Sequence, residues 1–232
     1  MLEVLYQDDH YIAINKPHGL LVHRSSIATN TDEYALQKLR DQIGRRVNPV
    51  HRLDRKTSGV LLFAYDQEST KRLHDLFSKG EITKKYLAIV RGHFPEYIEI
   101  DYALTNDRGK KQEARSIITN IQHTEINIPL GKWSTSRYSL VFVQPLTGRQ
   151  HQIRKHLSHL NHPIIGDRPH GCNKQNRLFK EKWNMINMML CATSLTFQHP
   201  YTQRKIKIQA SVSDTFSLTA NLLGINAASL EQ

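Results

Sequence analysis

One short segment carries an acidic side chain in a setting where chemistry is possible. Residues 48–59 read Asn-Pro-Val-His-Arg-Leu-Asp-Arg-Lys-Thr-Ser-Gly and lead into an apolar run. If residues 50–54 are extended, the two-residue period of a strand places Arg52 and Asp54 on one face, opposite His51 and Leu53. An aspartate two residues from an arginine is usually a surface ion pair. The turn that follows favours a second interpretation, a functional carboxylate at the end of a sheet.

Two further segments contain more polar and turn-forming residues than a core requires. Tyr86 opens an alternating stretch, where it could be a core residue, an edge residue or a phenol near a carboxylate. Residues 146–157 combine a turn at Gly148 with a basic helix. The histidines of that helix do not fit a metal site, because His151 and His156 are not on one helical face and no thiolate or carboxylate completes a set.

Periodicity and turn residues predict the elements that must position these groups. Asp66 and Gly80 are expected to cap the two ends of one helix. The helix near residue 154 should bury Ile153, Leu157 and Leu160 and turn Arg154 and Lys155 away from that stripe. The predicted helices are 33–43, 67–79, 149–160 and 214–223, and the predicted strands are 2–6, 11–15, 59–65, 86–90, 98–104, 116–121, 138–143, 190–197 and 206–210.

These elements alternate without a repeat, a low-complexity tract or a Gly/Ser linker. The sequence therefore predicts one continuous α+β domain over residues 1–232. We expect its polar end, residues 227–232, to be frayed.

The charge of the chain is concentrated in one segment. The 232 residues include 32 Lys+Arg against 21 Asp+Glu, a formal net charge of +11. Between residues 149 and 182 the acidic residues are Asp167 and Glu181, and the basic ones are Arg149, Arg154, Lys155, Arg168, Lys174, Arg177, Lys180 and Lys182. Lys and Arg neutralise phosphates, so this segment favours RNA or DNA as a partner over plain solubility. Its histidines are expected to be solvated or to face the nucleic acid.

Several classes of protein do not fit this composition. The longest apolar run, residues 60–65, is far short of the roughly 20 residues that span a bilayer, so no membrane association is expected. The start of the chain lacks the apolar stretch of a secretory signal. Cys172 and Cys191 can build neither a disulfide framework nor a zinc knuckle, which favours reduced thiols and a cytoplasmic protein.

Four motifs taken together resemble the RluA-type pseudouridine synthases. They are Lys16-Pro17-x-Gly19, His51-Arg52-Leu53-Asp54-x-x-Thr57-Ser58-Gly59, Lys85-Tyr86-x-Ala88 and Thr147-Gly148-Arg149-x-His151-Gln152-Ile153-Arg154-x-His156-Leu157. The resemblance extends from residue 2 to about residue 210. It implies the α+β catalytic fold of that family, with a mixed, mainly antiparallel central sheet flanked by helices and loops and a catalytic cleft across the sheet. An N-terminal S4 module is not expected.

The resemblance also implies roles for individual residues. Asp54 is the catalytic carboxylate, Arg154 pairs with it, and Tyr86 lies beneath a uridine base that has been flipped out of its stack. Arg52 fills the gap left by that base, and Leu190 is an apolar residue near the aspartate. The residues expected to bind the substrate RNA are Arg52, Leu190, Lys16, Arg149, His151, Lys155 and Lys174. One departure is Cys191, where relatives commonly have His; we interpret it as a core substitution.

The implied reaction converts uridine into pseudouridine without a cofactor or a metal ion. Details such as Arg137-Tyr138 resemble a branch of the family that acts on uridine 65 of certain tRNAs, so tRNA is the expected partner. An rRNA-directed enzyme of the same family is the first alternative, and a non-catalytic basic RNA-binding protein is the second. No obligate protein partner is evident.

Overall fold

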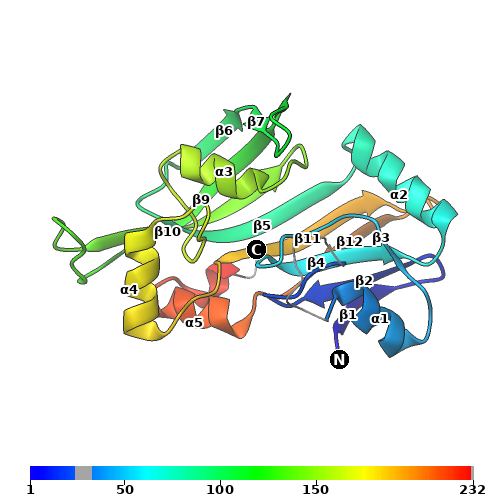
Figure 1. The fold of residues 1–232 in the computed structure, drawn as a ribbon, viewed down its shortest axis with the longest axis horizontal. Helices are drawn as coiled ribbons and strands as arrows, with labels where there is room; N and C mark the ends of the chain where they lie inside the picture. The colour runs from blue at the N-terminus through cyan, green and yellow to red at the C-terminus, as the bar shows by residue number, and fades with distance from the viewer. Residues whose placement is uncertain (24–32, 231–232) are drawn as a thin grey trace. The chain divides into compact units, whose positions relative to one another are not determined.

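A computed structural model describes residues 1–23 and 33–230 of the chain. The chain forms two compact units, Met1–Lys84 with Ala192–Ser211 and Lys85–Cys191 with Val212–Gln232. Strands β5 (Thr83–Arg91) and β11 (Leu190–Gln198) each contain residues of both units. Sheets with flanking helices confirm the predicted α+β class (Figure 1). The prediction of one continuous domain stays a prediction.

The first unit is built around a fully buried strand. All seven residues of β4 (Ser58–Ala64) are buried, as the apolar run in the sequence predicted. It pairs antiparallel with β2 (Tyr11–Lys16), which pairs with β1 (Glu3–Gln7), and also with the short β3 (Asn48–Pro49). On its other side β4 neighbours β11, which pairs with β12 (Lys205–Gln209). The helices of this unit are α1 (Ala35–Ile43) and α2 (Gln67–Lys79), and α2 contacts β3 and β4.

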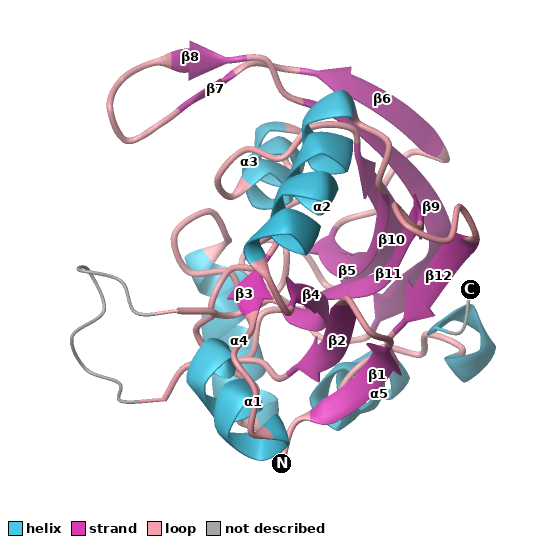
Figure 2. Cartoon of the chain, turned by 90° about the vertical axis from the view of Figure 1, so that its right-hand side faces the viewer, coloured by secondary structure: helices cyan, strands magenta, loops and turns pink. Residues whose placement is uncertain are grey.

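The second unit contains the longer strands. Its order is β5, β10 (Ser136–Pro145), β9 (Arg115–Ile126) and β6 (Tyr97–Asp101), with antiparallel pairing between neighbours. A separate small hairpin, β7 (Leu104–Thr105) and β8 (Lys111–Gln112), follows β6 (Figure 2). Helix α3 (Gln152–His159) contacts β10, and α4 (Asn173–Trp183), α5 (Asp214–Leu222) and a 3-10 turn at Ala227–Leu230 complete the unit. Residues 231–232 of the predicted frayed end lie outside the described residues.

Most predicted elements are confirmed within a few residues, and the differences have local causes. Asp66 and Gly80 cap α2 as expected. The predicted strand 98–104 is interrupted after Asp101, and the helix expected from residue 149 begins at Gln152. Helix α4 was not predicted, because most of its residues are polar and the apolar pair Phe179 and Trp183 is too short to give a clear helical period. No helix in the described part of the chain is long and apolar enough to span a membrane.

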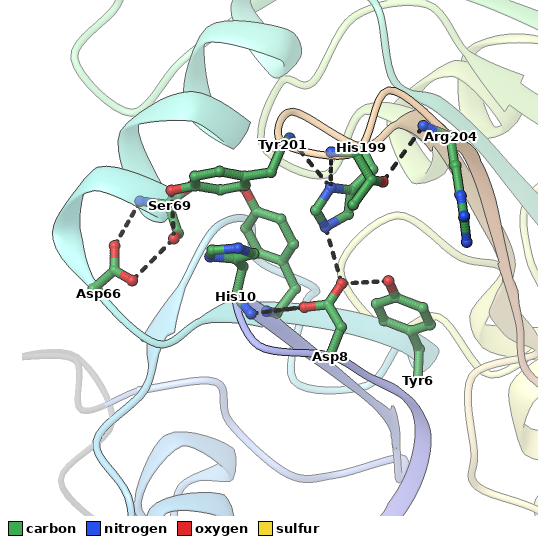
Figure 3. Close-up of polar contacts among 10 residues, drawn as sticks. Tyr6, Asp8, His10, Asp66, Ser69, His199, Tyr201 and Arg204 are labelled. Carbon is green, nitrogen blue, oxygen red and sulfur yellow. Dashed lines mark hydrogen bonds and ion pairs between the residues drawn. The ribbon is translucent and has the colours of Figure 1, made fainter.

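A cluster of polar and aromatic side chains ties distant segments of the first unit together (Figure 3). The Asp8 carboxylate accepts hydrogen bonds from the Tyr6 hydroxyl, from the backbone N–H groups of His10 and Tyr11, and from Nε2 of His199 at 2.9 Å. Nδ1 of His199 accepts the backbone N–H groups of residues 201 and 202, so the proton of this imidazole is on Nε2. We call this group the Asp8 cluster; it joins the β1–β2 turn to the turn after β11.

Candidate active site

Asp54 lies in a tight turn of the first unit, directly before β4. The backbone N–H of Thr57 donates to the Asp54 carbonyl at 3.0 Å, and β4 begins at Ser58. The side chain of Asp54 is half-buried, whereas Arg52 is exposed and Leu53 is buried. Residues 50–54, which would place Arg52 and Asp54 on one face if they were extended, form no strand, and strand pairing before the turn is limited to Asn48–Pro49. The carboxylate is nevertheless at the end of a buried strand, as predicted.

Lys16 fastens the neighbouring loop to this turn. Its ammonium group is fully buried and donates to the carbonyls of Pro17 at 2.9 Å, Leu20 at 2.8 Å and Arg55 at 3.2 Å. Gly19 and Arg55 add two more hydrogen bonds between the same segments, both 2.9 Å long. Because the three carbonyls belong to both segments, the ammonium group joins the loop to the turn. These contacts support a positioning role for Lys16, and its contact with RNA stays a prediction.

The histidines near the turn are held in their neutral form. Nε2 of His51 accepts the backbone N–H of Leu62 at 3.0 Å, and its ring packs against Phe77 with centroids 5.4 Å apart. Burial, followed by the charge of Lys84, lowers the pKa of His51 well below its usual value. Burial and then the cations of Lys16, Lys56 and Arg55 lower the pKa of His18 to about 4. Neither histidine therefore adds a positive charge next to the Asp54 turn at neutral pH.

The close approach of two strands fixes the start of β4. Gly59 has a φ of +106°, and a Cβ atom there would lie 2.1 Å from the carbonyl oxygen of Ala192 in β11. Only glycine permits this backbone conformation and this separation. The glycine of the sequence motif is therefore required by the packing of β4 against β11, five residues after the aspartate.

Tyr86, Leu190 and Cys191 belong to the second unit. Tyr86 lies in β5 opposite Val143 of β10, is half-buried, and packs against the core of this unit. Leu190 and Cys191 are both buried members of that core. The position of Cys191 agrees with its interpretation as a core substitution. Contact of Tyr86 or Leu190 with a base stays a prediction.

Arg154 forms a buried, bidentate ion pair within the second unit. Its Nε donates to Oδ2 of Asp167 at 2.7 Å, and one of its Nη atoms donates to Oδ1 at 2.8 Å. The exposed fractions are only 5% for Arg154 and 1% for Asp167. Arg154 was predicted to turn away from the apolar stripe of α3, yet it is as buried as Ile153 of that stripe. It pairs there with a carboxylate that the sequence did not single out. The pairing of Arg154 with Asp54 stays a prediction, since these residues belong to different compact units.

The start of α3 is organised by a buried glutamine. Oε1 of Gln152 accepts the Thr147 hydroxyl at 2.7 Å and the backbone N–H of Arg149 at 3.0 Å. Its amide donates to the Arg115 carbonyl and the Ser116 hydroxyl of β9. These contacts hold the Thr-Gly-Arg turn outside the helix, which explains why α3 begins at residue 152.

The histidines around α3 have different roles. His151 has a left-handed φ of 55°, and its Nδ1 lies 3.0 Å from Nε2 of His170. Burial, and then the positive charge of Arg154, lower the pKa of His170. His156 is fully buried between the Ser116 hydroxyl and the Tyr102 carbonyl, so the expectation that it is solvated or faces RNA is wrong.

The remaining predicted RNA contacts are at the surface of the second unit. Arg149 and Lys174 are exposed, and Lys155 is half-buried. Arg149 donates through Nε to the Glu113 carbonyl at 2.9 Å, and Lys155 donates to the Thr105 carbonyl at 3.2 Å. Arg168, Arg177, Lys180 and Lys182 are exposed as well. The basic segment therefore presents most of its charge to solvent, with Arg154 as the exception.

Sequence reasoning missed two residues that organise the site, Asp167 and Gln152. Asp167 could have been noticed by its negative charge, because it is one of two acidic residues in the otherwise basic segment 149–182. Gln152 left no comparable signal, since a glutamine in a polar helix is ordinary until its burial is known. No group of three or more His, Cys, Asp or Glu side chains able to hold a metal ion occurs among the residues that the structure describes.

The sequence of the chain matches one protein family over most of its length. Residues 10–159 match the family described as RNA pseudouridylate synthase. The protein named tRNA pseudouridine synthase C of Vibrio vulnificus is 44% identical over 223 residues, which cover 91% of each chain. The protein of the same name from Haemophilus ducreyi is 44% identical over 233 residues, 96% of each chain.

Solved structures show a similar fold. Human RNA Pseudouridylate Synthase Domain Containing 4 superposes with a TM-score of 0.75 at 24% identity, over 97% of this chain and 94% of the human one. Human RNA Pseudouridylate Synthase Domain Containing 1 gives a TM-score of 0.72 at 23% identity, with 90% and 83% coverage. At these identities the likeness concerns the fold alone.

Proposed function

We propose, since the chain belongs to the RNA pseudouridylate synthase family, that it isomerises uridine to pseudouridine in tRNA. The observation that carries the choice of tRNA is the 44% identity, over 91% or more of both chains, to proteins named tRNA pseudouridine synthase C. We further assign uridine 65 as the target and the cytoplasm as the compartment. The target follows the resemblance of the sequence to the branch that modifies this position.

The reaction is an isomerisation within one nucleotide. The N1–C1′ glycosidic bond breaks, the uracil ring turns, and a C5–C1′ bond forms. C5 then loses its proton and N1 gains one, so atoms and electrons balance without an oxidant or a reductant. A stacked uridine hides these atoms, so the nucleotide must first be flipped out, which costs a few kcal/mol.

Asp54 is the carboxylate that we assign to this reaction. It could attack C1′, add to the uracil ring, or assist loss of the C2′ proton on a path through a glycal, and each route begins with an ionised carboxylate. Its backbone is fixed by Thr57, and the Lys16 clamp holds the adjacent Arg55 carbonyl.

The other side chains bind and orient the flipped nucleotide. Tyr86 offers a ring on which uracil can stack and a hydroxyl that can relay the proton leaving C5. Arg52, exposed next to the Asp54 turn, takes the place of the flipped base in the RNA stack. Leu190 supplies an apolar contact near the reacting carboxylate. Arg154 contributes a guanidinium group that is fixed before substrate binds.

Release of tritium from tRNA labelled at C5 of uridine tests the reaction, because the C5 proton is lost only when pseudouridine forms. We expect release by the wild-type protein and a fall of about 10³-fold or more for Asp54→Asn, which keeps the shape and removes the charge. Asp75→Asn, an exposed change of the same type in α2, is the matched control and should release at the wild-type rate. Equal release by wild type and Asp54→Asn would contradict the assignment.

The choice of RNA is tested separately by mapping pseudouridines in a strain that lacks the gene. Carbodiimide modification followed by primer extension should show the loss of pseudouridine at tRNA position 65 and its return with the wild-type gene. Loss of an rRNA pseudouridine with position 65 intact would assign the enzyme to rRNA. Wild-type protein that binds RNA but releases no tritium would indicate the non-catalytic alternative.

A further inference from the structure

The Arg154–Asp167 pair is unusual because both charges are almost completely removed from solvent. The exposed fractions are 5% and 1%, and the two hydrogen bonds, 2.7 and 2.8 Å long, are parallel. Transfer of two ions from water to a protein interior is expensive, and a buried ion pair is often no more stable than an apolar pair of the same volume. Stability alone therefore does not account for this pair.

The Asp167 carboxylate is held in place because hydrogen bonds fix the backbone of its own loop. Nδ2 of Asn176 in α4 donates to the Asp167 carbonyl at 2.7 Å, and Oδ1 of Asn176 accepts the backbone N–H of Gly166 at 2.9 Å. The backbone N–H of His170 donates to Oδ1 of Asp167 at 3.3 Å. A Cβ atom at Gly171 would lie only 1.7 Å from the Asp167 carbonyl oxygen, so the loop closes tightly around this residue.

The same loop is attached to the strand that carries Tyr86. The backbone N–H of Ile165 donates to the Ile89 carbonyl at 3.0 Å, and the N–H of Arg91 donates to the Pro163 carbonyl at 3.0 Å. Asp167 is therefore fixed relative to β5 and α4 at once, and Arg154 is fixed through it. The orientation of the guanidinium is therefore set by β5 and α4 as well as by α3, the helix that carries Arg154.

From this arrangement we propose that Asp167 is a positioning residue for the isomerisation and acts through Arg154. The carboxylate binds one edge of the planar guanidinium, which fixes the direction in which the opposite edge presents its N–H groups to an anionic group. The guanidinium is oriented before the substrate binds, so no free energy has to be spent on ordering it during the reaction. This inference rests on the function proposed above.

Asp167→Asn is the first test. An amide presents one acceptor and one donor, so in either orientation an N–H faces an N–H of Arg154 and the parallel pair cannot form. We expect kcat for tritium release to fall about 100-fold, as for other small misplacements of a reacting group. KM for tRNA should stay within about twofold, because Asp167 is buried and does not contact the substrate.

A double-mutant cycle with Arg154→Lys separates this role from a structural one. Lysine cannot form the parallel pair, so Asp167→Asn should lower kcat by less than about threefold in that background. Glu125→Gln is the matched control, because it removes the same charge from an exposed pair with Arg137 in the same unit. It should leave both kcat and KM unchanged.

Asp167→Glu covers the case in which Asp167→Asn does not fold, since a lone buried guanidinium is costly. Glutamate keeps the charge and both acceptors but places them one methylene further out. We expect it to fold, to keep KM, and to lower kcat less than Asp167→Asn does. Its effect should also be lost in the Arg154→Lys background.

The possible results separate this inference from the proposed function. A wild-type protein that releases no tritium would overturn both. Wild-type release together with an unchanged kcat in Asp167→Asn would overturn only the role of Asp167. The role of Asp167 would also be overturned if Asp167→Asn or Asp167→Glu lowered kcat by the same factor in the wild-type background and in the Arg154→Lys background. A structural role does not depend on the guanidinium, so it would give equal losses.

Discussion

At the scale of single residues, neighbouring side chains in the first unit have different tasks. His51 and Asp54 are three residues apart, yet His51 is an acceptor for the β4 backbone and Asp54 lies in the turn that follows. Lys16 likewise holds the loop and the turn together from a fully buried position. The charge of a side chain therefore does not reveal its task here, and its burial and its hydrogen-bond partners do.

Lys16→Met tests the clamp on the Asp54 turn. Methionine fills a similar volume but leaves the Pro17, Leu20 and Arg55 carbonyls without their shared donor. We expect the free energy of unfolding to fall by about 2–3 kcal/mol, the cost of buried polar groups that lose a partner. Activity should fall through kcat, because the backbone next to Asp54 loses its anchor.

Lys71→Met, at an exposed position of α2, is the control for this change. It should leave the urea midpoint and the rate of tritium release unaltered. An unfolding free energy of Lys16→Met equal to that of the control would show that the buried ammonium does not hold the loop.

At the scale of elements, helices and strands were predicted wherever the chain gives a local signal. Asp66 accepts the Ser69 backbone N–H at 2.7 Å, and Gly80 ends α2 with a left-handed backbone, both as the sequence predicted. Helix α4 and the late start of α3 depend instead on tertiary contacts, those of Phe179 with the core and of Gln152 with β9. A local rule cannot detect either one.

The Asp8 cluster shows how polar contacts connect such elements, and its stability should depend on pH. Although burial alone would raise it, the pKa of Asp8 is lowered overall by hydrogen bonds from Tyr6 and the backbone and by His199. A carboxyl group whose pKa is lowered by folding stabilises the folded state at pH values above its pKa in the unfolded chain, about 3.9. This contribution is lost as the pH falls through the pKa of the folded state. We expect Asp8→Asn to destabilise the protein by about 2 kcal/mol at pH 7.

Denaturant unfolding at pH 7 and at pH 3 measures this dependence. The difference between Asp8→Asn and wild type should shrink at pH 3, because this pH is below the pKa of about 3.9 that an aspartate has in the unfolded chain, so part of the contribution of Asp8 is lost. The adjacent Asp9→Asn removes the same charge at an exposed position and should have little effect at either pH. A difference of the same size at both pH values would exclude a charged Asp8 as the source of the stability.

At the scale of the whole molecule, the net charge of +11 is suited to a polyanionic substrate. The exposed basic residues of segment 149–182 supply part of it, whereas Arg154 is neutralised by Asp167 inside the second unit. Arg52 is exposed beside the Asp54 turn. The charge is thus divided between side chains available to a phosphate backbone and one that is held in the interior.

Neutralising three of the surface residues tests their contact with RNA phosphates. For the triple change Arg149→Gln, Lys155→Gln and Lys174→Gln, the slope of log affinity against log salt should become shallower by about 2–3, since each phosphate that a cation neutralises adds about 0.7–0.9 to it. Weaker tRNA binding at low salt should accompany the smaller slope. Titration of labelled tRNA at several salt concentrations measures both.

The matched control neutralises Lys38, Lys71 and Lys79, which are exposed on α1 and α2 of the first unit. It makes the same change in net charge and should keep the wild-type slope. If the slope became shallower by the same amount in both triple variants, binding would follow total charge and not the basic segment.

The sequence by itself determined the fold class, most of the helices and strands, the family and the candidate carboxylate. Those conclusions depend on signals that are local: apolar periods, caps, and motifs in which residues a few positions apart are read together. Tertiary structure alone decided that Lys16 is a buried clamp, that His156 is structural, and that Asp167 holds Arg154. Burial and pairing arise between residues far apart in the chain, and the same lysine, histidine or aspartate would look identical in sequence at the surface.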